Sequence, residues 1–107
     1  SIMDQLTKVR QTDGNTGFEL LEAWGDRSEA DMFYVIIGQM KEAKQARIHM
    51  KTLVQHGYDG PGVLQKGDEY YVYSFSAEAF EVAYNFCKIH RKRDFHSAWV
   101  LVVPPAG

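Results

Sequence analysis

The sequence predicts an α+β fold, with strands and helices in the order β-α-β-β-α-β after an N-terminal extension. Two segments repeat apolar residues every three or four positions, as amphipathic helices do. Four short runs of β-branched and aromatic residues surround these segments, as strands do. The pattern occupies residues 32–104, which we expect to be the domain, and residues 1–31 form the extension.

The extension has one short apolar run. Residues 11–17 (QTDGNTG) are dense in turn-forming residues. Residues 18–24 (FELLEAW) then place aromatic and leucine side chains on one side of a short helix, which Gly25 would end. A helix of two turns is marginal in water, so we expect it to form only if it docks on the domain. A linker with a transient helix is the alternative.

The first half of the domain contains a strand and a helix. Residues 33–38 (FYVIIG) are β-branched and aromatic, which favours a strand with two apolar faces. Residues 41–57 (KEAKQARIHMKTLVQHG) are predicted to be a helix that ends at Gly57, a residue suited to the left-handed position after a last turn. Its apolar side chains recur at helical spacing at Ala43, Ala46, Met50, Leu53 and Val54.

The second half of the domain repeats this pattern with an extra strand in front. We expect a strand, a turn, a strand, a helix and a last strand over residues 63–65, 66–68, 69–75, 76–92 and 98–103. Ser76 or Ala77 is predicted near the N-cap of the helix. Pro104 and Pro105 would stop the last strand, because proline cannot donate a backbone hydrogen bond.

These elements predict a ferredoxin-like arrangement, in which a four-stranded antiparallel sheet carries both helices on one face. The other face would be open unless another segment covered it. Side chains alternate along strands, and those expected to point toward the helices are Phe33, Val35, Ile37 and Val72. Those expected on the open face are Tyr34, Ile36, Tyr71 and Tyr73.

The composition allows one domain and limits its partners. The hydrophobic fraction is 45% and the net charge is −2, which gives no overall attraction to nucleic acid or to an anionic membrane. No apolar run approaches the roughly 18–20 residues of a membrane span, so we expect no membrane insertion. Cys87 is the only cysteine and is predicted to be a buried small hydrophobe. The start at Ser1 suggests a fragment of a longer protein.

No catalytic or metal-binding motif is evident. The histidines at positions 49, 56, 90 and 96 form no i, i+4 pair on a helix, and we interpret His56 with Asp59, and His90 with Asp94 and His96, as surface arrangements. Ser28 and Ser97 have no convincing histidine partner. We therefore expect no enzyme activity, no metal and no cofactor.

The ordered set of segments resembles the SPOR (sporulation-related repeat) domains of bacteria, in a degenerate variant found in envelope proteins of the Bacteroidetes. The similarity covers about residues 32–104. Gly38 occupies the glycine position of the family's first turn, where Gln39 replaces serine and Met40 replaces phenylalanine. The other matching segments are KEAKQA, HGYD, EYYVYSFSAEAFEVAY and AWVLVV.

The resemblance implies a non-catalytic module that binds peptidoglycan glycan strands in the periplasm or cell envelope. The family binds glycan on the open sheet face, where tyrosine rings offer stacking surfaces and a hydroxyl group at the edge. The predicted ligand-binding residues are Tyr34, Ile36, Gln39, Gln65, Tyr71 and Tyr73. Gln39 and Gln65 are included because they lie at strand ends beside this face.

Three alternatives stay open. The tyrosines on the open face would simply stabilise the sheet through cross-strand pairs. Ile36 makes the face apolar where glycan-binding relatives carry polar residues, so the face would instead bind a protein, a second copy or the chain's own 18–24 segment. RNA-recognition motifs share the element order, and Lys88, Arg91, Lys92 and Arg93 would contact phosphates. The acidic balance argues against nucleic acid.

Overall fold

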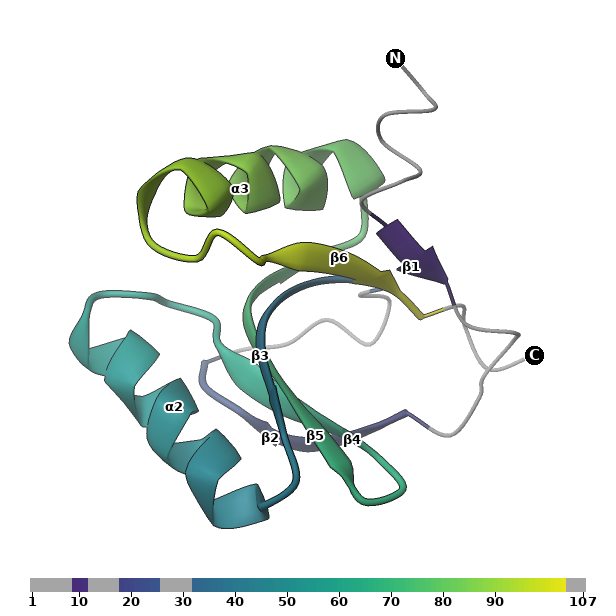
Figure 1. Ribbon diagram of the computed structural model, residues 1–107. Helices are drawn as coiled ribbons and strands as arrows, with labels where there is room; N and C mark the ends of the chain where they lie inside the picture. The colour runs from purple at the N-terminus through teal and green to yellow at the C-terminus, as the bar shows by residue number, and fades with distance from the viewer. Residues whose placement is uncertain (1–8, 12–17, 26–31, 104–107) are drawn as a thin grey trace.

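The computed structural model describes residues 9–11, 18–25 and 32–103. It is an α+β structure in which two helices pack on a six-stranded sheet (Figure 1). In chain order the elements are β1 (Val9–Gln11), β2 (Glu19–Ala23), β3 (Phe33–Met40), α2 (Ala43–Gln55), β4 (Gly62–Lys66), β5 (Glu69–Ala77), α3 (Phe80–Arg93) and β6 (Trp99–Val102).

The sheet has the strand order β1-β6-β3-β5-β4-β2. Its four central strands are antiparallel neighbours, as the sequence predicts, but the predicted number of four strands is wrong. β2 adds to β4 in antiparallel orientation, and β1 adds to β6 in parallel orientation. The extension therefore pairs with the two outer strands, whose edge backbone groups would otherwise lack partners in the sheet.

The helix predicted over residues 18–24 is wrong, because this segment contains β2. A two-turn helix has little stability of its own, whereas the edge of β4 offers a ladder of backbone hydrogen bonds. Beyond β2 the amide of Trp24 donates to the carbonyl oxygen of Pro61 at 2.9 Å. The segment nevertheless lies against the domain, since Leu21 packs on the core beneath α2.

Both helices form close to their predicted positions. Gly57 follows α2 with a φ of 91°, as expected for the left-handed residue after a helix. The start predicted for the second helix is wrong, because α3 begins at Phe80 and its N-cap residue is Ala79, whose side chain makes no cap. Ser76 instead pairs with Tyr34 in the β3–β5 ladder, and this pairing keeps the segment extended.

Two register irregularities occur between β3 and β5. Val35 pairs with Phe75, whereas the next residue, Ile36, pairs with Tyr73, which leaves Ser74 as an extra residue on β5. Ile37 is the extra residue on β3, so the two irregularities offset each other and the register is the same on either side. A bulge changes the direction of a side chain locally.

The predicted distribution of side chains over the two faces of the sheet is confirmed. Val35 and Val72 belong to the clusters beneath the helices, whereas Tyr34, Ile36 and Tyr73 form a separate cluster on the opposite face. The expectation that this opposite face is open is wrong. Tyr34 and Tyr73 are each 1% exposed and Ile36 is fully buried.

Phe18, the residue that precedes β2, contributes to this burial. Phe18 packs on the cluster of Tyr34, Ile36 and Tyr73, and its ring centroid lies 5.5 Å from that of Tyr71. The Tyr34 and Tyr73 rings meet edge to face at 5.0 Å. Aromatic pairs with this geometry are favourable beyond the area that they bury.

Gly62→Ala tests how closely Tyr73 packs over β4. A β-carbon at Gly62 would collide with the Tyr73 hydroxyl and would lie 2.7 Å from the carbonyl oxygen of Glu22. We expect a loss of about 1–3 kcal/mol in the free energy of unfolding, as for other overpacked sites. Urea denaturation followed by tryptophan fluorescence measures this loss.

Gly60→Ala is the matched control, because a β-carbon there has no neighbour within 4 Å. We expect it to change the free energy of unfolding by less than about 1 kcal/mol. Equal effects of the two substitutions would contradict the packing of Tyr73 against β4.

Candidate functional site

The residues predicted to bind a ligand do not form one accessible surface. Tyr34, Ile36 and Tyr73 are buried as described above, and only Tyr71 of the tyrosines on this face is half-buried. The Tyr71 ring lies between Phe18 and Trp99, with centroid distances of 5.5 and 6.2 Å. A sugar ring would have to displace these neighbours before it stacked on the buried tyrosines.

Both predicted glutamines are the next-to-last residues of their strands, β3 and β4, but they contact different tyrosines. The amide nitrogen of Gln39 donates to a carboxylate oxygen of Glu69 at 3.2 Å and to the Tyr71 hydroxyl at 3.5 Å. The amide nitrogen of Gln65 donates to the carbonyl oxygen of Gly67 at 3.0 Å. The structure therefore brings Gln39 and Tyr71 together, whereas the amide nitrogen of Gln65 donates to the turn after β4 and, at 3.3 Å, to the Tyr70 hydroxyl.

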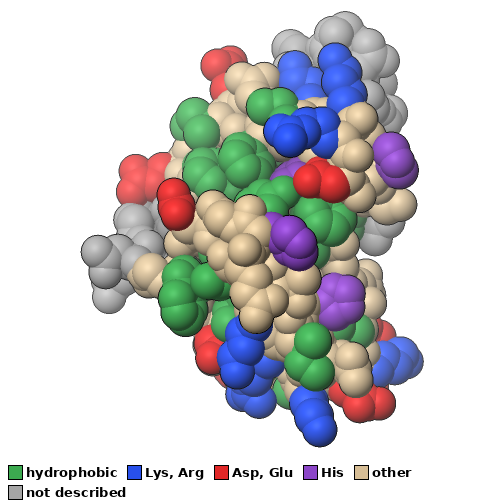
Figure 2. Space-filling model, turned by 90° about the vertical axis from the view of Figure 1, so that its left-hand side faces the viewer, with side chains coloured by type: hydrophobic (Ala, Val, Ile, Leu, Met, Phe, Trp, Pro, Cys, Tyr) green, Lys and Arg blue, Asp and Glu red, His purple; other side chains and the backbone are tan. Residues whose placement is uncertain are grey.

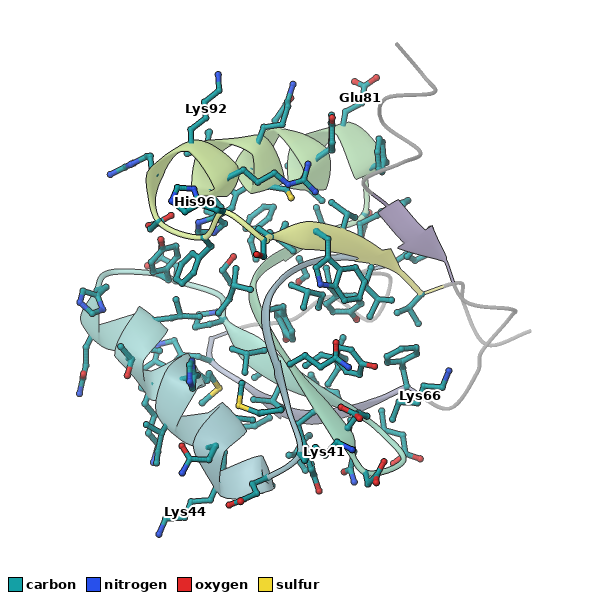
Figure 3. All side chains as sticks on the ribbon, in the orientation of Figure 1. Lys41, Lys44, Lys66, Glu81, Lys92 and His96 are labelled. Atoms are coloured by element: carbon teal, nitrogen blue, oxygen red, sulfur yellow. The ribbon has the colours of Figure 1, made fainter. Side chains whose placement is uncertain are left out.

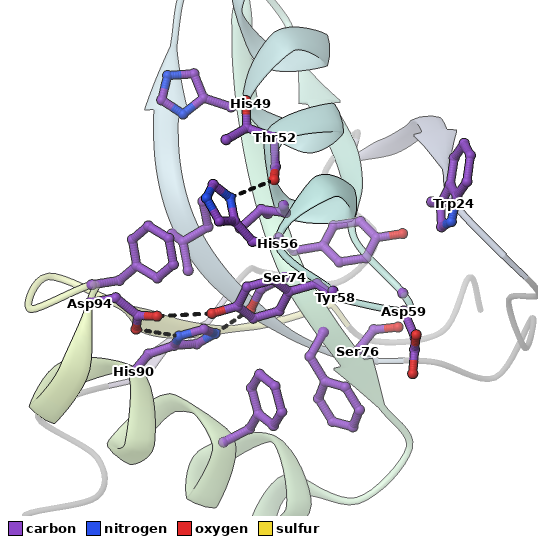
Figure 4. Close-up of a pocket in the computed structure, with 18 of the residues that line it drawn as sticks. Trp24, His49, Thr52, His56, Tyr58, Asp59, Ser74, Ser76, His90 and Asp94 are labelled. Atoms are coloured by element: carbon purple, nitrogen blue, oxygen red, sulfur yellow. Dashed lines mark hydrogen bonds and ion pairs between the residues drawn. The ribbon is translucent and has the colours of Figure 1, made fainter.

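A different site lies on the helix side of the sheet, in a groove between α2 and α3 (Figure 4). Its volume is about 1340 Å³, above the roughly 300–1,000 Å³ of typical small-molecule pockets. The floor comes from the sheet and includes both extra residues of the bulged strands, Ile37 and Ser74. The two helices form the walls.

Exposed apolar side chains are concentrated around this groove. Among the described residues, the large hydrophobic side chains that are most exposed are Leu20, Trp24, Ile48, Val82 and Ile89. Trp24, Ile48 and Ile89, with exposures of 51%, 47% and 51%, line the groove. Figure 2 shows hydrophobic and histidine side chains on this side of the molecule, between Lys and Arg side chains above and below.

A chain of hydrogen bonds crosses the groove floor from β5 to the end of α3. Ser74 Oγ lies 2.7 Å from His90 Nε2, and His90 Nδ1 lies 3.0 Å from Asp94 Oδ1. The Tyr58 hydroxyl, in the connection after α2, donates to Asp94 Oδ2 at 3.0 Å. With the Nδ1 proton directed at the carboxylate, Nε2 accepts a hydrogen bond from the Ser74 hydroxyl.

The His90 ring is enclosed by aromatic side chains. It stacks on Tyr58 at a centroid distance of 5.5 Å and meets the edges of Phe86 and Phe95 at 5.0 Å each. His90 is 3% exposed, so the prediction that His90 and Asp94 form a surface arrangement is wrong for the histidine. Both of its nitrogens have partners, as a buried imidazole requires.

The order of atoms in this chain matches a serine–histidine–aspartate triad, but the surroundings do not favour nucleophilic catalysis. In such a triad the serine must reach a substrate carbonyl. Ser74 is 2% exposed and lies on a strand beneath the α3 helix. The chain of hydrogen bonds is therefore best explained as a connection between β5, α3 and the Tyr58 loop.

Sequence reasoning missed this cluster for a physical reason. His90 and Asp94 are four residues apart, a spacing visible in the sequence, but Ser74 and Tyr58 are distant in the chain. Ser74 reaches His90 where it is the extra residue of β5 opposite β3, and strand alternation alone does not predict a bulge.

The electrostatic environment of Asp94 and Tyr58 follows from these contacts. The hydrogen bond from His90 lowers the pKa of the Asp94 carboxyl below its ordinary value of 3.8, and the hydrogen bond from Tyr58 acts in the same direction. Burial raises the pKa of Tyr58 above 10.0, and the hydrogen bond to Asp94 raises it further. Asp94 therefore stays ionised at neutral pH as the acceptor for both groups.

Two other kinds of feature, a metal-binding cluster and a membrane-spanning helix, were sought among the described residues. Within residues 9–11, 18–25 and 32–103, no group of three His, Cys, Asp or Glu side chains is arranged to hold a metal ion. Neither described helix has the length and apolar character needed to cross a membrane. Comparisons with protein-family models, curated proteins and solved structures gave no match to this chain.

The lowered pKa of Asp94 predicts a pH dependence of stability. A depressed carboxyl pKa in the folded state stabilises it above the unfolded pKa, and this contribution disappears as pH falls through the folded value. We expect the stability difference between wild type and Asp94→Asn to be largest near neutral pH and to shrink below pH 3.8. Urea denaturation from pH 7 to pH 2.5 measures it. A constant difference over this range would contradict the Asp94–His90 contact.

Ser74→Ala tests the structural interpretation of the hydrogen-bonded chain. Loss of the hydroxyl leaves a buried nitrogen of His90 without its partner, at a cost of about 1–3 kcal/mol. Ser97→Ala is the control at an exposed serine and should change stability by less than about 0.5 kcal/mol.

We also expect a fluorophosphonate probe to leave wild-type Ser74 unmodified. Labelling of Ser74, detected by peptide mass spectrometry, would instead indicate an activated nucleophile.

Proposed function

We propose that this chain is a non-catalytic protein-interaction module that binds its partner in the groove between α2 and α3. One observation carries the proposal: three of the five exposed large hydrophobic side chains among the described residues line this groove. Exposed apolar side chains that gather in one place, rather than scatter singly, mark sites where proteins bind partners. Tryptophan in particular is enriched among residues that dominate binding energy.

The order β6-β3-β5-β4, with both helices packed on the same side, supports a finer description of the fold. We infer that these strands and helices form a ferredoxin-like unit, to which β1 and β2 are added. This is the architecture that the SPOR resemblance implies. Membership of that family and a location in the periplasm remain predictions that rest on the resemblance.

Glycan binding through the sheet is the less favoured alternative. It requires Tyr34 and Tyr73 to present their rings to a sugar, and each is 1% exposed. A degenerate relative that has kept the fold and binds a protein fits this burial better. The groove also exceeds the size of typical small-molecule pockets, whereas a peptide segment would fill it.

A peptide selection tests the groove as the binding site. The full chain is immobilised and exposed to a displayed library of random 16-residue peptides, and enriched peptides are synthesised for anisotropy titrations. We expect Ile89→Ala to weaken their binding about tenfold, as truncation of a central apolar contact does. Val82→Ala is the matched control, because Val82 is also on α3, is also 51% exposed and does not line the groove.

Enrichment of peptides that both variants bind equally, or no enrichment at all, would contradict a groove site.

A second experiment tests glycan binding with purified peptidoglycan sacculi, either intact or stripped of stem peptides. We expect neither preparation to retain the wild type in a pull-down. Retention that Tyr71→Ala abolishes would favour the sheet face and glycan.

A further inference from the structure

Histidine is concentrated in the lining of the groove between α2 and α3. Three of the chain's four histidines line it, at positions 49, 56 and 90. His90 is buried, and both of its nitrogens have partners within the chain. His49 on α2 and His56 at the C-cap of the same helix are exposed. A ligand that fills the groove therefore lies against the two exposed rings.

The ring of His56 is held in one orientation. Figure 4 shows it between Thr52 of α2 and the hydrogen-bonded chain of Tyr58, Asp94 and His90, and its Nδ1 lies 2.8 Å from the carbonyl oxygen of Thr52. A carbonyl oxygen only accepts hydrogen bonds, so Nδ1 carries the proton of the neutral ring and Nε2 is an acceptor. A second proton, taken up in acid, adds to Nε2.

The charged lining of the groove favours neither an acidic nor a basic partner. It consists of Asp59, Asp94 and Arg93. Asp94 already accepts hydrogen bonds from His90 and Tyr58, and the positive charge of Arg93 acts on the same carboxylate. A charged side chain of a partner would lose its water here without meeting a dominant opposite charge. The lining thus suits uncharged, apolar side chains.

Charges of both signs surround His56, so no single neighbour determines its protonation. The carboxylates of Asp59 and Asp94 attract a cation at this position, as does the C-terminal end of α2. Arg93 repels a cation, as do the basic residues of α2. These basic residues are Lys44, Arg47, which pairs with Glu22 of β2, and Lys51. A ligand leaves these charges in place and removes the water.

We propose that the groove binds an uncharged, apolar segment of a partner protein at neutral pH and releases it on acidification. A segment that covers Ile48 and Ile89 also takes water away from the His56 ring between them. The neutral ring tolerates this and accepts a hydrogen bond at Nε2 from an N–H of the segment. An imidazolium has no acceptor to offer and would be buried as a charge.

Proton and segment therefore weaken each other's binding, because the segment binds the form of His56 that has lost its second proton. Affinity falls as pH drops through the range in which histidine ordinarily becomes charged, between about pH 8 and pH 5. This inference rests on the proposed function and specifies both the chemistry of the partner and the regulation of the site.

Anisotropy titrations at two pH values test the inference. The probe is a groove-dependent peptide, defined by its weaker binding to Ile89→Ala, that contains no histidine and has blocked termini. We expect the wild type to bind it about three- to tenfold more weakly at pH 5.5 than at pH 7.5. Circular dichroism at both pH values checks that the fold is unchanged.

His56→Gln should reduce this ratio to less than about twofold, because glutamine retains hydrogen-bonding groups but takes up no proton. His96→Gln is the matched control. His96 is also exposed and also directs Nδ1 at a backbone carbonyl oxygen, that of Arg91, at 2.8 Å. It lies outside the groove, beside the connection from α3 to β6 (Figure 3). This variant should keep the full pH dependence of the wild type.

Calorimetry measures the proton directly. The heat of peptide binding at pH 6.5 is compared in two buffers of different ionisation enthalpy. We expect the wild type and His96→Gln to release up to about one proton on binding, and His56→Gln to release less. Proton uptake by the wild type would contradict the inference.

The remaining outcomes separate the inference from the proposed function. Equal affinity of the wild type at the two pH values, or an undiminished ratio in His56→Gln, would overturn the inference and leave the groove as the binding site. Groove-dependent peptides dominated by charged residues of one sign would do the same. The absence of any groove-dependent peptide would overturn both.

Discussion

The burial of the Tyr34–Tyr73 pair determines which side of the sheet is available to a ligand. The two rings meet edge to face at 5.0 Å and are almost fully buried, with Phe18 packed on their cluster. An isolated four-stranded sheet would have exposed this face, and the packing of Phe18 on it changes its role from surface to core. Since the tyrosine cluster on one face of the sheet is buried, the accessible apolar surface lies on the helix side.

The groove on that side depends on a local departure from regular pairing. Ile37 and Ser74 are the extra residues of adjacent strands, and both lie in the groove floor. Ser74 thereby reaches His90, which contacts Asp94 at the end of the same helix. A buried imidazole with both nitrogens bonded fixes the position of α3 relative to β5, because breaking either bond leaves a desolvated polar atom. The bulges and this chain together define the groove geometry.

The fold was more accessible to sequence reasoning than the site. Hydrophobic periodicity predicts both helices and the four central strands, because burial of an apolar stripe requires that spacing. The same reasoning failed for residues 18–24, where apolar spacing fits a short helix but pairing with β4 decides the outcome. It failed again at Ser74, because a bulge results from the relative register of two strands that are far apart in sequence. The exposure of the tyrosine face likewise depended on a covering segment that alternation does not identify.

The charge distribution follows the same division of the molecule into two faces. Burial of the tyrosine face on one side leaves α2 and α3 as the outer layer of the other, and those helices carry seven of the 12 basic residues. The groove between these helices is lined by Arg93 but also by the carboxylates of Asp59 and Asp94. Glu22, which comes from the added strand β2, pairs with Arg47 of α2. The strand that completes the sheet edge is thus also tied to one of the two helices by an ion pair, so the same added strand supports both layers of the fold.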